Sequence, residues 1–157
     1  MYELIDPEFV TSQKITNIFK NAYIDIKEAQ YLSDSDSYYW MIELNSEGVL
    51  IGLDPKEKQF DIGENTALCT YNEFENNERF ILNLINEMNK RFNIRSYIRL
   101  DKEQSICVFS ARAVYRYGKG FNPADFIDEC RFFAGAYRHM LSNYLVPKFK
   151  QEGILND

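Results

Sequence analysis

The stretch ERFILNLINEMNKRFNIRSYIRLDKEQSICVFSARAVYRY, residues 78–117, decides the fold, because a helical pattern passes directly into a pattern typical of a β-hairpin. Its first part places five apolar residues at helical intervals with polar residues between them: Ile81, Leu84, Ile85, Met88 and Phe92. We predict a helix over 78–92. Two strand-like segments follow, separated by the short polar loop Asp101–Gln104.

The hairpin has two faces of different character. If Leu100 pairs with Ser105, alternation assigns a core face to Ile94, Ser96, Ile98, Leu100, Cys107, Phe109 and Ala111. The opposite face carries Arg95, Tyr97, Arg99, Ile106, Val108, Arg112, Val114 and Arg116. These eight residues are the candidate partner-binding site.

The flanking sequence completes an α+β pattern. A helix is predicted over 10–21, capped by Thr11 or Ser12, and the segments from Tyr23 to residue 71 alternate as three or four strands. A last helix from Pro123 to about Leu145, with an apolar stripe that includes Leu141 and Tyr144, is expected to end at Pro147. We expect an antiparallel sheet of five to six strands with three helices, in the order α-β-β-β(β)-α-β-β-α.

Size and composition predict a single domain over 1–157, with an ordered core over about 10–145 and frayed tails. The acidic start MYELIDPEF and the short apolar runs favour a cytoplasmic protein without membrane spans. Cys69, Cys107 and Cys130 are odd in number and form no CxxC pair, which favours buried free thiols over disulfides or zinc. The net charge of −6 disfavours nucleic acid as a partner.

The order of elements, together with ILNLINEMNKRF, the charged hairpin and the aromatic last helix, resembles the YbjN family of bacterial sensory transduction regulators. That family is similar in fold to type III secretion chaperones. Its motif, Leu-Asn-x-x-Asn, corresponds here to Ile85, Asn86 and Asn89, with Ile in place of Leu. The resemblance spans roughly residues 10–145. It implies a non-enzymatic regulatory or chaperone-like binding protein, often a dimer, and it transfers no catalytic residues.

Familiar catalytic patterns are missing from the sequence. His139 is the only histidine, so no second imidazole exists for a metal site or a proton relay. Gly118-Lys119-Gly120 is too short to cradle phosphate and is interpreted as a turn, while Asp34-Ser35-Asp36 lacks the remaining ligands of a calcium loop. We therefore expect no cofactor or metal. An enzyme of unfamiliar type, whose carboxylates converge only in the fold, stays an alternative.

Asn86 and Asn89 are three residues apart and can share one helical face. In the structural interpretation they bond to a neighbouring loop or to the start of the hairpin. In the functional interpretation their amides bind a partner peptide.

Charge is distributed unevenly along the chain. Residues 90–119 contain eight basic residues against two acidic ones, inside an acidic protein. Three interpretations remain open: neutralisation by acidic residues of the same chain, an interface for a protein or peptide, or a site for nucleic acid or another polyanion. An exposed hairpin edge could also accept an extended peptide as an added strand. The leading hypothesis is a protein-binding module that forms a homodimer.

Overall fold

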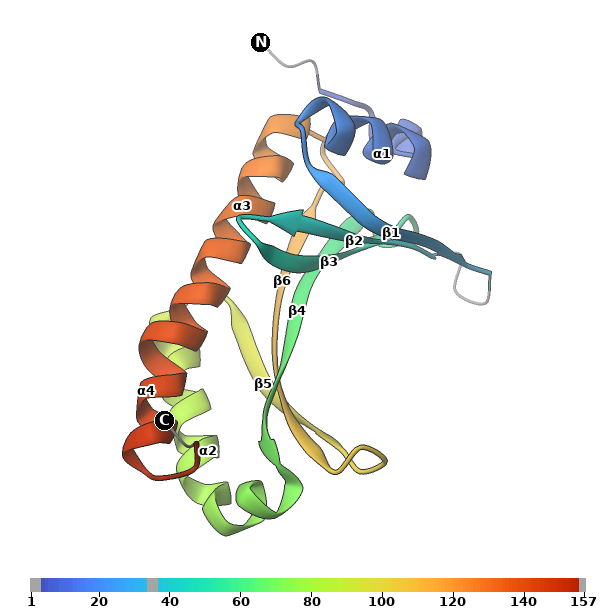
Figure 1. The fold of residues 1–157 in the computed structure, drawn as a ribbon. Helices are drawn as coiled ribbons and strands as arrows, with labels where there is room; N and C mark the ends of the chain where they lie inside the picture. The colour runs from blue at the N-terminus through green and yellow to red at the C-terminus, as the bar shows by residue number, and fades with distance from the viewer. Residues whose placement is uncertain (1–3, 34–36, 156–157) are drawn as a thin grey trace. The chain divides into compact units, whose positions relative to one another are not determined.

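The computed structural model describes residues 4–33 and 37–155. Figure 1 shows the helices and strands in chain order. Their bounds are η1 Pro7–Phe9, α1 Ser12–Asn21, β1 Asp25–Leu32, β2 Ser37–Leu44, β3 Glu47–Asp54, β4 Gln59–Thr70, α2 Tyr71–Arg91, β5 Arg95–Asp101, β6 Ile106–Arg116, α3 Pro123–His139, η2 Met140–Leu145 and α4 Val146–Gln151.

The strands form one six-stranded antiparallel sheet in the order β1-β2-β3-β4-β6-β5, which confirms the predicted α+β class. Strands β1 and β5 are its two edges. The chain divides into two compact units: the first holds the residues up to Gly63 and Ala113–Gly135, and the second holds Glu64–Arg112 and the residues from Ala136 onward. Strands β4 and β6 and helix α3 each contribute to both units.

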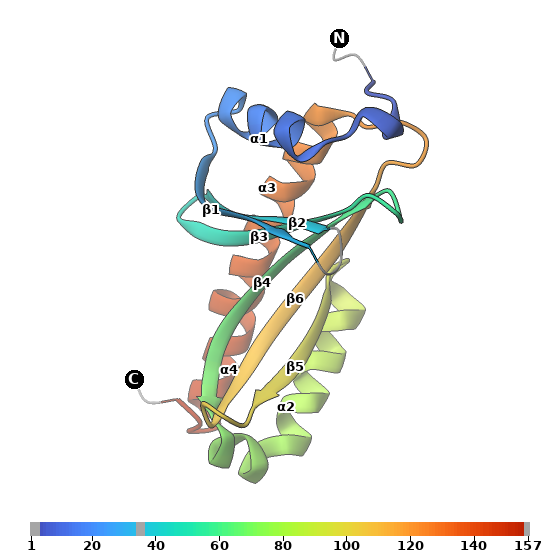
Figure 2. The ribbon, with the colours of Figure 1, turned by 90° about the vertical axis from the view of Figure 1, so that its right-hand side faces the viewer.

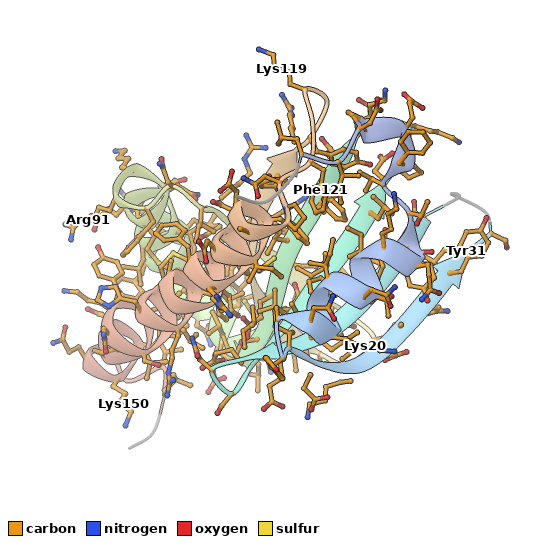
Figure 3. All side chains as sticks on the ribbon, turned by 90° about the horizontal axis from the view of Figure 1, so that it is seen from above. Lys20, Tyr31, Arg91, Lys119, Phe121 and Lys150 are labelled. Atoms are coloured by element: carbon orange, nitrogen blue, oxygen red, sulfur yellow. The ribbon has the colours of Figure 1, made fainter. Side chains whose placement is uncertain are left out.

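An aromatic cluster forms the core of the first unit. The ring of Phe60 lies 4.4 Å from that of Phe126 and 5.5 Å from that of Phe121, measured between centroids. Phe121 points inward in Figure 3, whereas Lys119 extends away from the loop after β6. Trp40 is fully buried beneath α1, and its Nε1–H donates to Thr16 Oγ1 over 3.0 Å. The indole is thus packed with its polar atom satisfied.

Helix α2 begins at Tyr71, seven residues earlier than the apolar pattern predicts. Thr70 and Glu73 form a capping box: Glu73 Oε2 accepts from the Thr70 backbone N–H at 2.7 Å, and Thr70 Oγ1 accepts from the Glu73 N–H at 3.2 Å. Asn77 departs from helical backbone angles, with φ −126° and ψ 15°, so the first turns are kinked relative to the rest. The predicted apolar stripe is confirmed, because Ile81, Leu84, Ile85 and Met88 are buried.

The prediction that Pro147 ends the last helix is wrong. Helix α3 passes into the π-helical turn η2 and then into α4, in which Pro147 occupies an N-terminal position. A proline, which lacks an N–H and clashes with the preceding turn inside a helix, is tolerated at that position. Beyond Pro147, the side chains of Phe149 and Ile154 are buried. Near the N-terminus, Ile5 forms a β-bridge with Phe121.

The π turn also shifts the apolar stripe. The helical pattern predicts that Leu141 and Tyr144 face the core, but both are only half-buried, while Met140 and Leu145 are fully buried. A π turn brings residues five apart onto one side of the helix. The stripe therefore changes position by one residue at η2.

The hairpin register differs from the prediction by two residues. Leu100 pairs with Cys107, and Asp101 with Ile106, so the connecting loop is 102–105 instead of Asp101–Gln104. A shift of two residues leaves every side chain on its predicted face, whereas a shift of one would have exchanged the faces.

Candidate functional site

The β5–β6 hairpin of the second unit packs one face against helices. On that face the Phe109 ring stacks on Tyr137 of the helix, with centroids 5.5 Å apart, and Ser96 Oγ lies 3.8 Å from Met140 Sδ. Figure 1 shows α2 and α4 on the same side of the hairpin, and Figure 2 looks onto the opposite side, which carries no helix.

The opposite side is the basic face, which we define by Arg95, Tyr97, Arg99, Val108 and Arg112. Arg95 is the cross-strand partner of Arg112, and Arg99 is the partner of Val108. The three arginines are exposed and Tyr97 is 44% exposed, whereas Val108 is buried. Like charges directly opposite each other disfavour pairing, so the Arg95–Arg112 pair does not serve the stability of the hairpin.

Neutralisation within the chain accounts for only part of this charge. Arg112 does interact with other groups of the protein. Arg95 and Arg99, by contrast, form no ion pair with any residue in 4–33 or 37–155. Two guanidinium groups of the basic face thus keep their donors available to another molecule.

The remaining three predicted site residues are not part of the basic face as we define it. Ile106 is half-buried beside the tip of the hairpin, opposite Asp101. Val114 and Arg116 are exposed on β6, but they belong to the first unit. The basic face thus holds five of the eight predicted residues, and partner binding by any of the eight stays a prediction.

The outer edge of β5 is covered at one point by Asn89. Its Nδ2–H donates to the Ser96 carbonyl at 2.8 Å, and its Oδ1 accepts from the Ser96 N–H at 2.7 Å. Ser96 therefore directs both backbone groups away from β6. In an antiparallel pair this direction repeats at every second residue, so Ile98 and Leu100 also point their backbone groups outward.

Nothing in the described part of the chain bonds to the outward groups of Ile98 and Leu100. Leu100 is 36% exposed and Ile98 is half-buried. The edge of β5 thus offers two N–H and two C=O groups next to Arg99 and Tyr97.

The two motif asparagines differ in their surroundings. The Asn89 amide bonds to the start of the hairpin, as the structural interpretation expects, whereas Asn86 lies exposed on α2. Whether either asparagine also contacts a partner stays a prediction.

The single histidine lies in an aromatic and polar cluster at the end of α2. His139 Nδ1 is 2.9 Å from Asn143 Nδ2, and the His139 ring meets the edge of Phe92 at 5.9 Å. Nearby, Tyr144 donates to Glu87 Oε2 at 3.0 Å, and Arg91, labelled in Figure 3, lies over the Tyr144 ring. Burial, followed by the bond to Glu87, raises the pKa of Tyr144.

The described ranges offer no candidate metal site. They contain no group of three His, Cys, Asp or Glu side chains that could hold a metal ion. Gly118–Gly120 lies in a turn closed by the Gly120 N–H on the Tyr117 carbonyl. The predicted candidate Asp34-Ser35-Asp36 lies outside the described residues. None of the helices described is long and apolar enough to cross a bilayer.

A groove between α1 and α3 in the first unit has no counterpart in the sequence patterns. It has a volume of about 530 Å³, with Ile18, Ala22 and Ile127 among its apolar lining and Asp128 and Arg131 among its polar lining. Its two walls are about a hundred residues apart in sequence, so local patterns could not reveal it. No group of reactive side chains converges there.

Comparison with known proteins supports the fold alone. No family model matches the chain, and no curated protein matches it. A crystal structure of an uncharacterized protein from Methanothermobacter thermautotrophicus is similar, with a TM-score of 0.63 and 12% sequence identity. The similarity covers 93% of this chain and 100% of that one. The archaeal protein thus shares the α+β architecture defined above.

Proposed function

We propose that this protein is a non-enzymatic binding module, of the regulatory or chaperone-like kind that its sequence resembles, and that it holds an acidic, extended segment of a partner protein in the cytoplasm. The observation that carries the proposal is the basic face, where Arg95 and Arg99 are exposed without an ion pair in the part of the chain described.

Arginine suits this role for chemical reasons. Its planar guanidinium offers five donors and binds carboxylates through two parallel hydrogen bonds. Tyr97 lies between Arg95 and Arg99 along the same face of β5 and adds contact area at a small cost in side-chain entropy. Carboxylates spaced two residues apart in an extended segment would match this repeat, because side chains alternate along a strand.

The edge of β5 supplies the backbone part of the proposed contact. An extended segment adds to an exposed edge by hydrogen bonds between main chains, while pockets for alternate side chains provide specificity. Since Asn89 already bonds to Ser96, an added strand would pair with Ile98 and Leu100.

The test uses fluorescein-labelled peptides and the full chain. A peptide of alternating Glu and Val should bind, as measured by anisotropy, and a matched Lys and Val peptide should not. The double variant Arg95→Gln/Arg99→Gln should raise the dissociation constant about fivefold or more. Lys90→Gln/Lys148→Gln, at two exposed positions on helices, removes equal charge and should leave binding unchanged.

If both double variants lost binding equally, the effect would depend only on net charge. A specific role of the basic face would then be refuted. Tighter binding to single-stranded DNA than to the acidic peptide, with a steep loss on raising salt, would instead establish a polyanion site.

A further inference from the structure

Two of the three cysteines meet in the second unit. Cys69 is the penultimate residue of β4, and Cys107 is the second residue of β6, the neighbouring strand. Both are buried, at 9% and 0% exposure. The two thiols lie near enough for each to shift the pKa of the other.

Backbone pairing at the end of the two strands brings these residues near each other. The Tyr71 N–H donates to the Ser105 carbonyl at 2.9 Å, which sets Tyr71 opposite Ser105. Cys69 is two residues before Tyr71 on β4, and Cys107 is two residues after Ser105 on β6, so this bond brings the two cysteines near each other. A disulfide needs a Cα separation of about 4.4–6.8 Å, a range that residues facing each other on adjacent antiparallel strands can meet.

The two thiols are unequal. The hydrogen bond from Cys107 lowers the pKa of Cys69, and the same bond raises the pKa of Cys107, with burial adding to that rise. Since the thiolate is the nucleophilic form, Cys69 is the one that attacks an oxidant. Cys107 is then the neighbouring thiol that can attack the oxidised sulfur.

We propose that Cys69 and Cys107 are a redox modification site, at which a hydroperoxide converts the thiol pair into a disulfide. The Cys69 thiolate attacks one peroxide oxygen, the O–O bond breaks, and a sulfenic acid and one water form after proton uptake. The Cys107 sulfur attacks Cys69 Sγ, the S–OH bond breaks, and a second water leaves. Two thiols and one hydrogen peroxide thus give one disulfide and two waters.

This site is independent of the proposed binding function. A disulfide between Cys69 and Cys107 would close a loop that contains the whole of α2 and β5. It would join β4, which leads into the Thr70–Glu73 capping box, to β6, which follows the hairpin loop.

The experiment treats the reduced full chain with hydrogen peroxide, removes the peroxide with catalase, and alkylates the unfolded protein with N-ethylmaleimide. Reduced protein should take up one label on each of its three cysteines, and oxidised protein should take up only the label on Cys130. Before alkylation the intact mass should fall by about 2 Da, and peptide mapping should find Cys69 linked to Cys107.

Single variants assign the roles. Cys130→Ser should still lose about 2 Da. Cys107→Ser should accumulate a sulfenic acid at Cys69 that dimedone traps, and Cys69→Ser should leave Cys107 unmodified. Wild-type protein that keeps three alkylatable thiols at a peroxide dose that oxidises free cysteine would overturn the proposal, and so would a link through Cys130. Because the wild-type mapping needs no variant, the proposal can be refuted even if every variant misfolds.

Discussion

The two edge strands of the sheet, β1 and β5, differ in how far they are shielded from pairing with a further strand. On β1, Lys27 Nζ lies 2.5 Å from Asp25 Oδ2 and 3.0 Å from Glu43 Oε2, and the strand is irregular in register between Ile26 and Glu28. Charge and irregularity are both known devices against unwanted strand pairing. Strand β5 is regular, and Asn89 covers it only at Ser96. The comparison shows that an edge strand can be shielded by residues of its own unit, as β1 is, or can keep backbone groups available to another molecule, as β5 does.

Proline substitution gives the strongest test of which backbone groups of β5 face outward. Arg99→Pro removes an N–H directed at β6 and should lower the free energy of unfolding by about 3 kcal/mol or more. Leu100→Pro removes only an outward N–H and should cost about 1 kcal/mol. Urea denaturation of both variants measures the difference. Equal losses would mean that β5 has no open edge at Leu100.

Removal of the Asn89 amide should have an intermediate effect. Asn89→Ala leaves the Ser96 N–H and carbonyl without their partner and should cost about 2 kcal/mol, roughly 1 kcal/mol for each bond. Asn86→Ala, at an exposed position three residues earlier, is the matched control and should change stability little. Thermal unfolding and hydrogen exchange at the Ser96 amide are the measurements. A stable Asn89→Ala protein that loses a captured partner would favour the functional interpretation of the motif.

The smallest effects are expected from the charges of the two edges. Lys27→Gln removes exposed ion pairs, so its melting temperature should fall by about 1 °C or less at low salt and not at all at high salt. Hydrogen bonds to Asp25 and then Glu43 raise the Lys27 pKa above 10.5, so this contribution exists below pH 10.5 and disappears as the pH rises through the folded-state pKa. Arg99→Gln should leave the melting temperature unchanged at low and at high salt. A salt-sensitive fall in the melting temperature of Arg99→Gln would reveal an ion-pair partner of Arg99 within the chain.

The sequence predicts the hairpin faces well because side chains alternate strictly along a strand. The predicted pairing of Leu100 with Ser105 is wrong by two residues, yet the residues that share each face are predicted correctly, since side chains alternate with a period of two. Their burial is predicted less well, because Leu100 on the predicted core face is exposed and Val108 on the opposite face is buried. The apolar pattern misses the early start of α2, although Thr70 and Glu73 carry the spacing of a capping box. Few apolar residues precede Ile81 at helical intervals, and the kink at Asn77 separates the first turns from the stripe.

Other features depend on distances that no local pattern contains. The proximity of Cys69 and Cys107 follows from the pairing of β4 with β6, two strands separated in sequence by a helix and another strand. The absence of an ion pair at Arg95 and Arg99, within the described ranges, depends on where the fold places the acidic side chains of other elements. Sequence can name such residues, but only the packed chain determines which of them meet.

The π turn at Met140–Leu145 has a consequence for comparing this chain with related sequences. A π turn holds one residue more than an α turn, so it can arise by insertion of a single amino acid into a continuous helix. A homologue without that residue would align with this chain on each side of the turn but show a gap of one position inside it. Any alignment that forbids gaps within helices would then place Phe149 and Ile154 opposite surface positions.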